Sequence, residues 1–123
     1  MSERRAVCLN CMDGRTQLPV IQWIMKNYQI DFVDMVTEAG MDGFLADQNS
    51  PMGEIHRMVN ISTNINKALM IFVVGHFDCR GNPVDEITHR TQIAAGVKRI
   101  QNDYPDKDVI GAWVNDQWKV EKL

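Results

Sequence analysis

The sequence has few cysteines, no long apolar run and no excess of basic charge. Only 3 of its 123 residues are cysteines, an odd number and too few for a disulfide scaffold. The longest apolar stretch, residues 68–75, is far too short to cross a bilayer. The 13 basic residues are scattered and the net charge is -3, so no basic stripe suited to nucleic acid is present. We therefore expect neither a membrane nor a nucleic acid as a partner.

The N-terminal residues lack the apolar core of an export signal. Only residues 6–9 separate Arg5 from the polar Asn10, which is too short a run for a signal peptide. Free thiols are typical of a reducing compartment, so the sequence predicts a cytoplasmic protein.

The composition is that of an ordinary folded domain. Hydrophobic residues make up 45% of the chain and charged residues 24%. The sequence contains no internal repeat, low-complexity tract or linker. One domain spanning residues 1–123 is the prediction.

Short apolar runs alternate with segments of helical periodicity. Each apolar run is followed by glycine or polar residues, as expected where a strand ends and a loop begins. The predicted strands are residues 5–9, 31–36, 69–74 and 109–114.

Proline residues mark the expected helix starts. Pro19 is predicted in the first turn of one helix, Ser50–Pro51 at the start of a second, and Pro83 at the start of a third. Residues 41–49 have no clean period and are predicted as a loop with some helix. The chain is expected to end in a short tail from Trp118.

This alternation predicts an α/β fold with a mostly parallel central sheet of about four strands and helices on both faces. In such sheets ligands bind outside the carboxyl ends of the strands. Cys11 follows the first predicted strand, and His76 and Cys79 follow the third. If these strands are neighbours, the three side chains meet.

Thiolates and imidazole are ligands that zinc prefers, and two cysteines with one histidine leave a fourth position open, as in catalytic zinc sites. The spacing from His76 to Cys79 lets both side chains converge on one point. The alternative is that the cysteines are merely small apolar residues of the core.

The residues around these candidates resemble two motifs of the β-class carbonic anhydrases. Residues 11–15, CMDGR, resemble the family's Cys-x-Asp-Ser-Arg, and residues 75–79, GHFDC, resemble its Gly-His-x-x-Cys. Residues 36–40 stand where the family carries Arg-Asn-Ala-Gly, and residues 109–116 are similar to its last core strand and turn. The resemblance covers nearly the whole chain and implies a β-carbonic-anhydrase-like fold.

The resemblance implies one Zn2+ per chain, bound by Cys11, His76 and Cys79, with Asp13 and Arg15 as catalytic residues. The reaction it implies is the reversible hydration of CO2 to bicarbonate by a metal-bound hydroxide. A bound water with a pKa of about 8 is expected beside two thiolates. Arg15 would hold Asp13 off the metal through a two-pronged ion pair. The family resemblance also implies a homodimer or a higher homo-oligomer.

The chain departs from the family pattern near the expected cleft. Gly14 replaces the usual serine, Thr37–Glu38 replace Arg-Asn, and Arg80 replaces the glycine after the second cysteine. These departures leave the zinc ligands intact and alter the surroundings in which a substrate would bind.

Three alternatives to CO2 hydration stay open. The chain could bind zinc in a regulatory role without turnover, or act on a CO2-like molecule such as carbonyl sulfide or carbon disulfide. A thiol redox role would use Cys8 with Cys11. No proton-transfer residue is identified, since His56 and His89 are both expected to face solvent.

Overall fold

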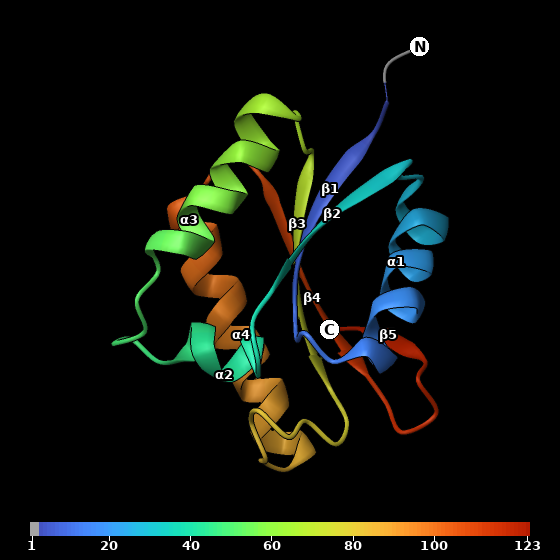
Figure 1. Cartoon of the computed structure of the whole chain (residues 1–123), viewed down its shortest axis with the longest axis vertical. Coiled ribbons are helices and arrows are strands. Elements are labelled where there is room, and N and C mark those ends of the chain that lie inside the picture. The colour runs from blue at the N-terminus through green and yellow to red at the C-terminus, as the bar shows by residue number, and fades with distance from the viewer. Residues whose placement is uncertain (1–2) are drawn as a thin grey trace.

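The computed structural model describes residues 3–123 and shows a five-stranded sheet with helices on both faces (Figure 1). The strand order is β2-β1-β3-β4-β5; the first four strands are mutually parallel and β5 is antiparallel to β4. Their bounds are β1 (Arg5–Asn10), β2 (Phe32–Thr37), β3 (Met70–His76), β4 (Asp108–Val114) and β5 (Val120–Lys122). The predicted α/β class with a mostly parallel sheet is confirmed.

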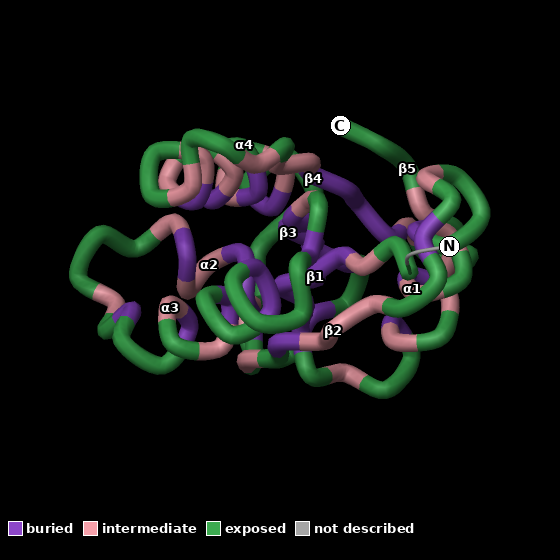
Figure 2. Tube along the Cα trace, turned by 90° about the horizontal axis from the view of Figure 1, so that it is seen from above, coloured by how far each residue is buried: buried purple, intermediate pink, exposed green. Residues whose placement is uncertain are grey.

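The helices divide unequally between the two faces of the sheet. Helix α1 (Gly14–Tyr28) covers one face, whereas α2 (Met41–Ala46), α3 (Gly53–Asn60) and α4 (Glu86–Asp103) cover the other (Figures 1 and 2). A π-helical turn (Ile61–Ile65) continues α3. No helix within residues 3–123 has the length and apolar character needed to span a bilayer.

The central strands are buried because both faces of the sheet are covered. In β1, Val7 and Leu9 pack with the residues of α2, α3 and α4, whereas Ala6 and Cys8 pack toward α1. Residues 71–74 of β3 are all fully buried, as their continuous apolar run predicts. Cys8 is fully buried too, and burial raises the pKa of its thiol. It is therefore a core residue, which argues against a redox pair with Cys11.

Two of the three helix starts predicted from proline are wrong, because aspartate caps begin α1 and α4. The third, at Ser50–Pro51, lies close to the start of α3 at Gly53, which has no side-chain cap. Helix α1 begins at Gly14, where the Asp13 side chain accepts a hydrogen bond from the Arg15 N–H, and Pro19 lies inside the helix. Helix α4 begins after Asp85, which accepts from the Thr88 N–H. The caps satisfy N–H groups that the first turn leaves free.

The short tail predicted from Trp118 contains a fifth strand that the sequence did not indicate. Strand β5 pairs with residues 112–114 of β4, after a turn in which the Asn115 side chain accepts hydrogen bonds from the Gln117 and Lys119 N–H groups. A strand of three residues is too short to give a periodic signal. Its consequence is that Trp118 is held near the carboxyl ends of the parallel strands.

Candidate metal centre

The three predicted metal ligands lie at the carboxyl ends of two adjacent strands. Cys11 directly follows β1, His76 is the last residue of β3, and Cys79 lies in the turn beyond it. Strands β1 and β3 pair in parallel, with Leu9 opposite Val73, so their carboxyl ends reach the same edge of the sheet. The structure brings all three predicted ligands together.

The ligand atoms are spaced as a tetrahedral metal site requires. One atom from each of Cys11, His76 and Cys79 lies within 4.8 Å of the other two, and all three residues are buried. The two sulfur atoms are 3.9 Å apart. Two Zn–S bonds of about 2.3 Å at the tetrahedral angle separate their sulfurs by roughly 3.8 Å. The separation of the two sulfurs therefore matches that of a tetrahedral zinc site.

His76 is held in the form that binds a metal. Its Nδ1–H donates to the Phe77 carbonyl at 2.7 Å, while its Nε2 is buried with no hydrogen-bond partner among the described residues. Burial lowers the pKa of His76, which favours the neutral ring. The unpaired Nε2 thus presents a lone pair at the centre of the group, as a metal ligand does.

The Cys79 thiol has to lose its proton before it can bind a metal ion. Burial and the neighbouring Cys11 raise the pKa of Cys79 to about 11. The backbone N–H of Gly40 donates to the Cys11 sulfur at 3.5 Å. The thiol of Cys79 is therefore protonated at neutral pH in the metal-free protein, and a metal ion must displace that proton.

We expect the affinity for zinc to rise with pH. Between pH 6 and 8 the Cys79 thiol lies below its pKa of about 11, so each proton displaced should lower the apparent Kd about tenfold per pH unit. Competition with a chromophoric chelator, corrected for the chelator's own protonation, measures this slope. A Kd independent of pH would contradict the assignment of Cys79 as a ligand.

Asp13 and Arg15 form an ion pair beside the ligand group. The Arg15 Nη2 donates to one carboxylate oxygen of Asp13 at 2.7 Å, and its Nε donates to the other at 3.1 Å. These bonds to Arg15 are the main reason that the pKa of Asp13 falls to about 2. The carboxylate is consequently ionised at neutral pH, and the two-pronged geometry predicted for the pair is present.

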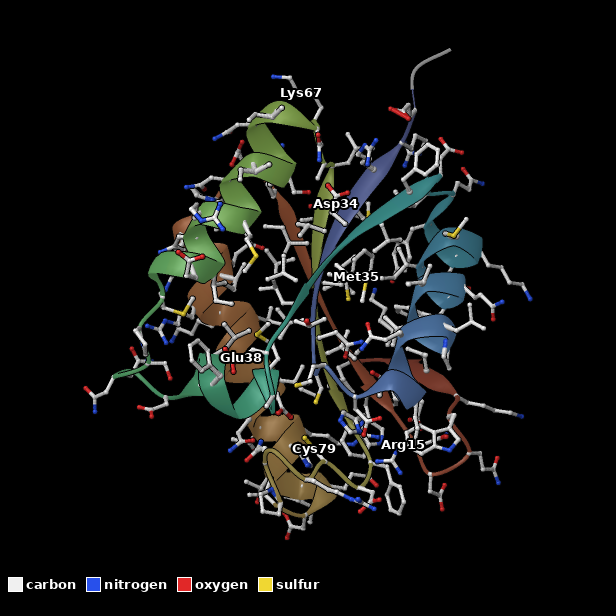
Figure 3. The ribbon with its side chains drawn as sticks, in the orientation of Figure 1. Arg15, Asp34, Met35, Glu38, Lys67 and Cys79 are labelled. Carbon is white, nitrogen blue, oxygen red and sulfur yellow. The ribbon has the colours of Figure 1, made fainter. Side chains whose placement is uncertain are left out.

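Two residues that the sequence did not indicate hold Arg15 in place. Asp78 accepts from the Arg15 guanidinium at 3.1 Å through both its carboxylate and its backbone carbonyl. The ring of Trp118 lies under the guanidinium, 4.6 Å from ring centroid to Cζ, and 6.4 Å from the ring of His76. Figure 3 shows Arg15 and Cys79 near the same end of the sheet, far from Lys67.

Comparison with known proteins identifies the family. The family model described as "Putative carbonic anhydrase" matches residues 1–123. The chain belongs to this family. A search of curated protein sequences gave no significant match.

Solved β-carbonic anhydrases share the fold. One from the filamentous ascomycete Sordaria macrospora superposes with a TM-score of 0.67 at 13% identity, covering 99% of this chain and 82% of the other. The β-carbonic anhydrase CcaA gives 0.64 at 11%, covering 98% and 80%. A carbonic anhydrase from Glaciozyma antarctica gives 0.60 at 15%, covering 94% and 80%. At these identities the comparison establishes the fold alone.

Lack of space does not explain why this chain has Gly14 where the family usually has serine. A Cβ built at Gly14 would meet no atom within 4 Å, so a serine side chain would fit. The chain has therefore lost a hydroxyl near the predicted site without gaining a closer contact there.

The expectation that both remaining histidines face solvent is right for one and wrong for the other. The His56 side chain is 38% exposed and its Nε2 pairs with Asp103 at 2.9 Å. His89 is only 2% exposed and its Nδ1 donates to the buried carboxylate of Asp42. The prediction for His89 was wrong because the periodicity of α4 does not indicate that Asp42 of α2 lies beside it.

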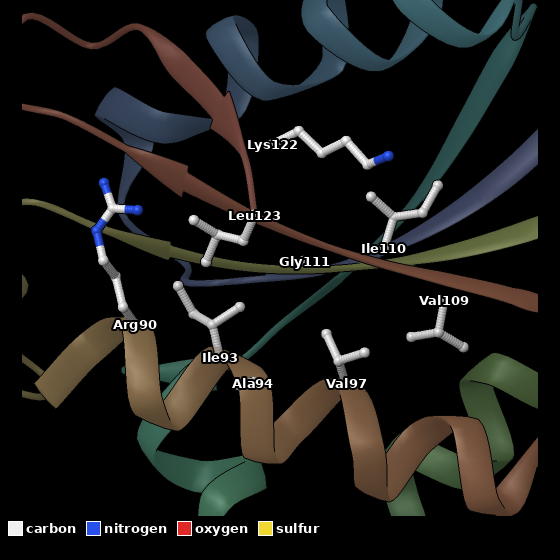
Figure 4. A pocket seen from close by; sticks show the side chains of 9 residues that line it. All are labelled: Arg90, Ile93, Ala94, Val97, Val109, Ile110, Gly111, Lys122 and Leu123. Carbon is white, nitrogen blue, oxygen red and sulfur yellow. The ribbon is translucent and has the colours of Figure 1, made fainter. Parts of the chain in front are cut away.

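A cavity of about 580 Å³ lies away from the ligand group. It opens where β5 ends, between α4 and the outer edge of β4 (Figure 4). Most of its lining is apolar, including Ile93, Val97 and Val109, and Arg90 and Lys122 line it as well. None of the predicted site residues lines it.

Proposed function

We propose that this protein is a zinc-dependent carbonic anhydrase, a lyase that hydrates CO2 reversibly to bicarbonate. Zn2+ would be bound by Cys11, His76 and Cys79, one ion per chain. The observation that carries the proposal is the buried, unpaired Nε2 of His76, which lies with two thiols at the spacing of a tetrahedral zinc site. Membership of the carbonic anhydrase family supports the choice of reaction.

The metal would supply the nucleophile. When bound, zinc lowers the pKa of a water molecule from about 16 toward neutrality, and two thiolate ligands favour a value of about 8. The two buried cysteines and the neutral His76 would hold the ion at the carboxyl ends of β1 and β3.

Asp13 would orient the attacking water. Its carboxylate is ionised, since its pKa is about 2, and so it can only accept a hydrogen bond. A free carboxylate in this place could itself bind zinc and block the fourth position. Arg15 occupies both oxygens of Asp13, and Asp78 and Trp118 keep Arg15 from swinging away. The ion pair would therefore keep Asp13 from binding the metal.

We also propose that the protein assembles as a homodimer or a higher homo-oligomer in the cytoplasm. The related enzymes from Sordaria macrospora are described as tetrameric. Two exposed apolar side chains flank the ligand group, Met12 at 64% and Phe77 at 45%, and a second subunit would cover such residues. Free cysteines support a reducing compartment.

Stopped-flow CO2 hydration on protein of known zinc content tests the proposal. We expect turnover that increases through an ionisation at about pH 8, disappears with a chelator and returns with added zinc. The same preparation should be assayed with carbonyl sulfide and carbon disulfide.

One zinc per chain with no rate above the buffer would refute CO2 hydration. If carbonyl sulfide and carbon disulfide are not turned over either, the second candidate, zinc binding without turnover, would hold. It is favoured by Thr37–Glu38, which stand where the family carries Arg-Asn, and by the hydroxyl missing at Gly14.

A further inference from the structure

A buried aspartate–histidine pair, Asp42 and His89, has no part in the reaction proposed above. Asp42 on α2 is 1% exposed and His89 on α4 is 2% exposed, and the His89 Nδ1–H donates to Asp42 Oδ2 at 2.5 Å. A buried polar pair of this kind is weak evidence for stability, because well-packed apolar residues often serve as well. Its position suggests another reason for its presence.

The other oxygen of Asp42 fastens the turn that carries Cys79. Asp42 Oδ1 accepts from its neighbour Gly43 N–H at 2.8 Å and from the Asn82 side-chain amide at 3.0 Å. The Asn82 backbone N–H in turn donates to the Cys79 carbonyl at 3.3 Å. The carboxylate is thus joined to the third predicted ligand through one residue.

The same carboxylate also lies against the backbone that presents His76, and the chain just before Asp42 contacts Cys11. Gly75 immediately precedes His76, and a Cβ at Gly75 would clash with Asp42 Oδ2. Gly40, two residues before Asp42, donates its N–H to the Cys11 sulfur. Gly40 has a left-handed φ of 62° and packs so closely on Gly81 that a Cβ there would lie 2.8 Å from the Gly81 carbonyl.

We propose that Asp42, held by His89, is a positioning residue that preorganises His76 and Cys79 for metal binding. Its carboxylate lies against Gly75, which precedes His76, and accepts from Asn82, which bonds to the Cys79 carbonyl. The inference rests on the proposed metal site. Its consequence is that Asp42 sets zinc affinity although it is not itself a ligand.

The test compares zinc affinity in variants of this network by competition with a chromophoric chelator. Asp42→Ala should weaken zinc binding about tenfold to a hundredfold, as the loss of residues that orient metal ligands does. Asp42→Asn keeps an oxygen for Gly43 and Asn82 and should restore most of the affinity. Asn82→Ala keeps the backbone bond to Cys79 but removes the side-chain bonds to Asp42 and Gln92, which frees the Cys79 turn from the carboxylate. This variant should weaken binding about tenfold.

Asp34→Ala is the matched control. Asp34 also accepts several hydrogen bonds, from Ser62 at 2.7 Å, Asn66 at 3.0 Å and Arg5 at 3.1 Å. It lies on β2, well separated from Cys79 in Figure 3. Its loss should lower stability and leave the zinc Kd within about twofold, because distant sites act independently.

A spectroscopic measurement separates positioning from a general loss of stability. Cobalt bound in place of zinc should show altered visible absorption bands in Asp42→Ala and Asn82→Ala, and unaltered bands in Asp34→Ala. Equal zinc Kd values and identical cobalt spectra in the wild type, Asp42→Ala and Asn82→Ala would overturn the proposal.

Failure of the role proposed for Asp42 and failure of the proposed CO2 hydration give different results. A wild-type protein that binds zinc but does not hydrate CO2 refutes the function, and weakened binding in the variants would still support the role of Asp42. A wild-type protein with no zinc affinity would overturn both.

Discussion

Replacing Cys11 with serine should abolish zinc binding and, with it, any CO2 hydration. A serine hydroxyl stays protonated and is a poor ligand for zinc, so only His76 and Cys79 would remain. Structural zinc sites bind the ion with a free energy of roughly 10–16 kcal/mol. Loss of one of three ligands should remove a large share of that energy and weaken binding by about a thousandfold or more. Metal analysis after dialysis against a chelator, together with stopped-flow assays, measures both effects.

Cys8→Ala is the control for this substitution. Cys8 lies on β1, three residues before Cys11, but its side chain is fully buried on the α1 face and is outside the ligand group. The control should retain one zinc per chain. If Cys11→Ser also retained it, the ligand set would be wrong.

Asp13→Ala should keep zinc and lose turnover. The substitution removes the carboxylate proposed to orient water, and we expect CO2 hydration to fall by about a hundredfold to ten-thousandfold. The helix cap is lost as well, at a cost of about 1 kcal/mol in the free energy of unfolding. The decisive quantities are kcat/KM and the zinc content of the same sample.

Asp13→Asn separates these two effects. Asparagine is as good a helix cap as aspartate, so the variant should retain its stability while losing the charge that the Arg15 pair requires. Loss of turnover in both variants would assign the effect to the carboxylate. Full turnover in Asp13→Ala would show that Asp13 does not orient the reacting water.

The parts predicted correctly from the sequence depend on rules that act along the backbone. The continuous apolar run in β3 implies burial on both faces, and parallel pairing brings the ends of strands β1 and β3 to one edge. The approach of Cys11, His76 and Cys79 follows from that pairing, because each lies at or just beyond a strand end. These features required no knowledge of side-chain packing.

The parts that the sequence did not reveal depend on contacts between distant segments. His89 lies 47 residues from Asp42, and nothing near either residue in the sequence indicates the other. Trp118 reaches Arg15 only because a three-residue strand returns the chain along β4. The starts of α1 and α4 were predicted wrongly for a local reason. Both aspartate and proline are typical of helix starts, and the sequence pattern does not show which of the two marks the first residue.

The order of the strands has a consequence for the order of assembly. Cys11 and Cys79 are 68 residues apart, and the segment between them includes α1, β2, α2, α3 and β3. Closing a loop of this length is an entropic cost that parallel strands must meet before they pair. A chain emerging from the ribosome with β1 through α3 exposed would carry only Cys11 of the three ligands. We expect metal capture to follow the insertion of β3 beside β1, so that the ion is acquired late in folding and does not guide its early steps.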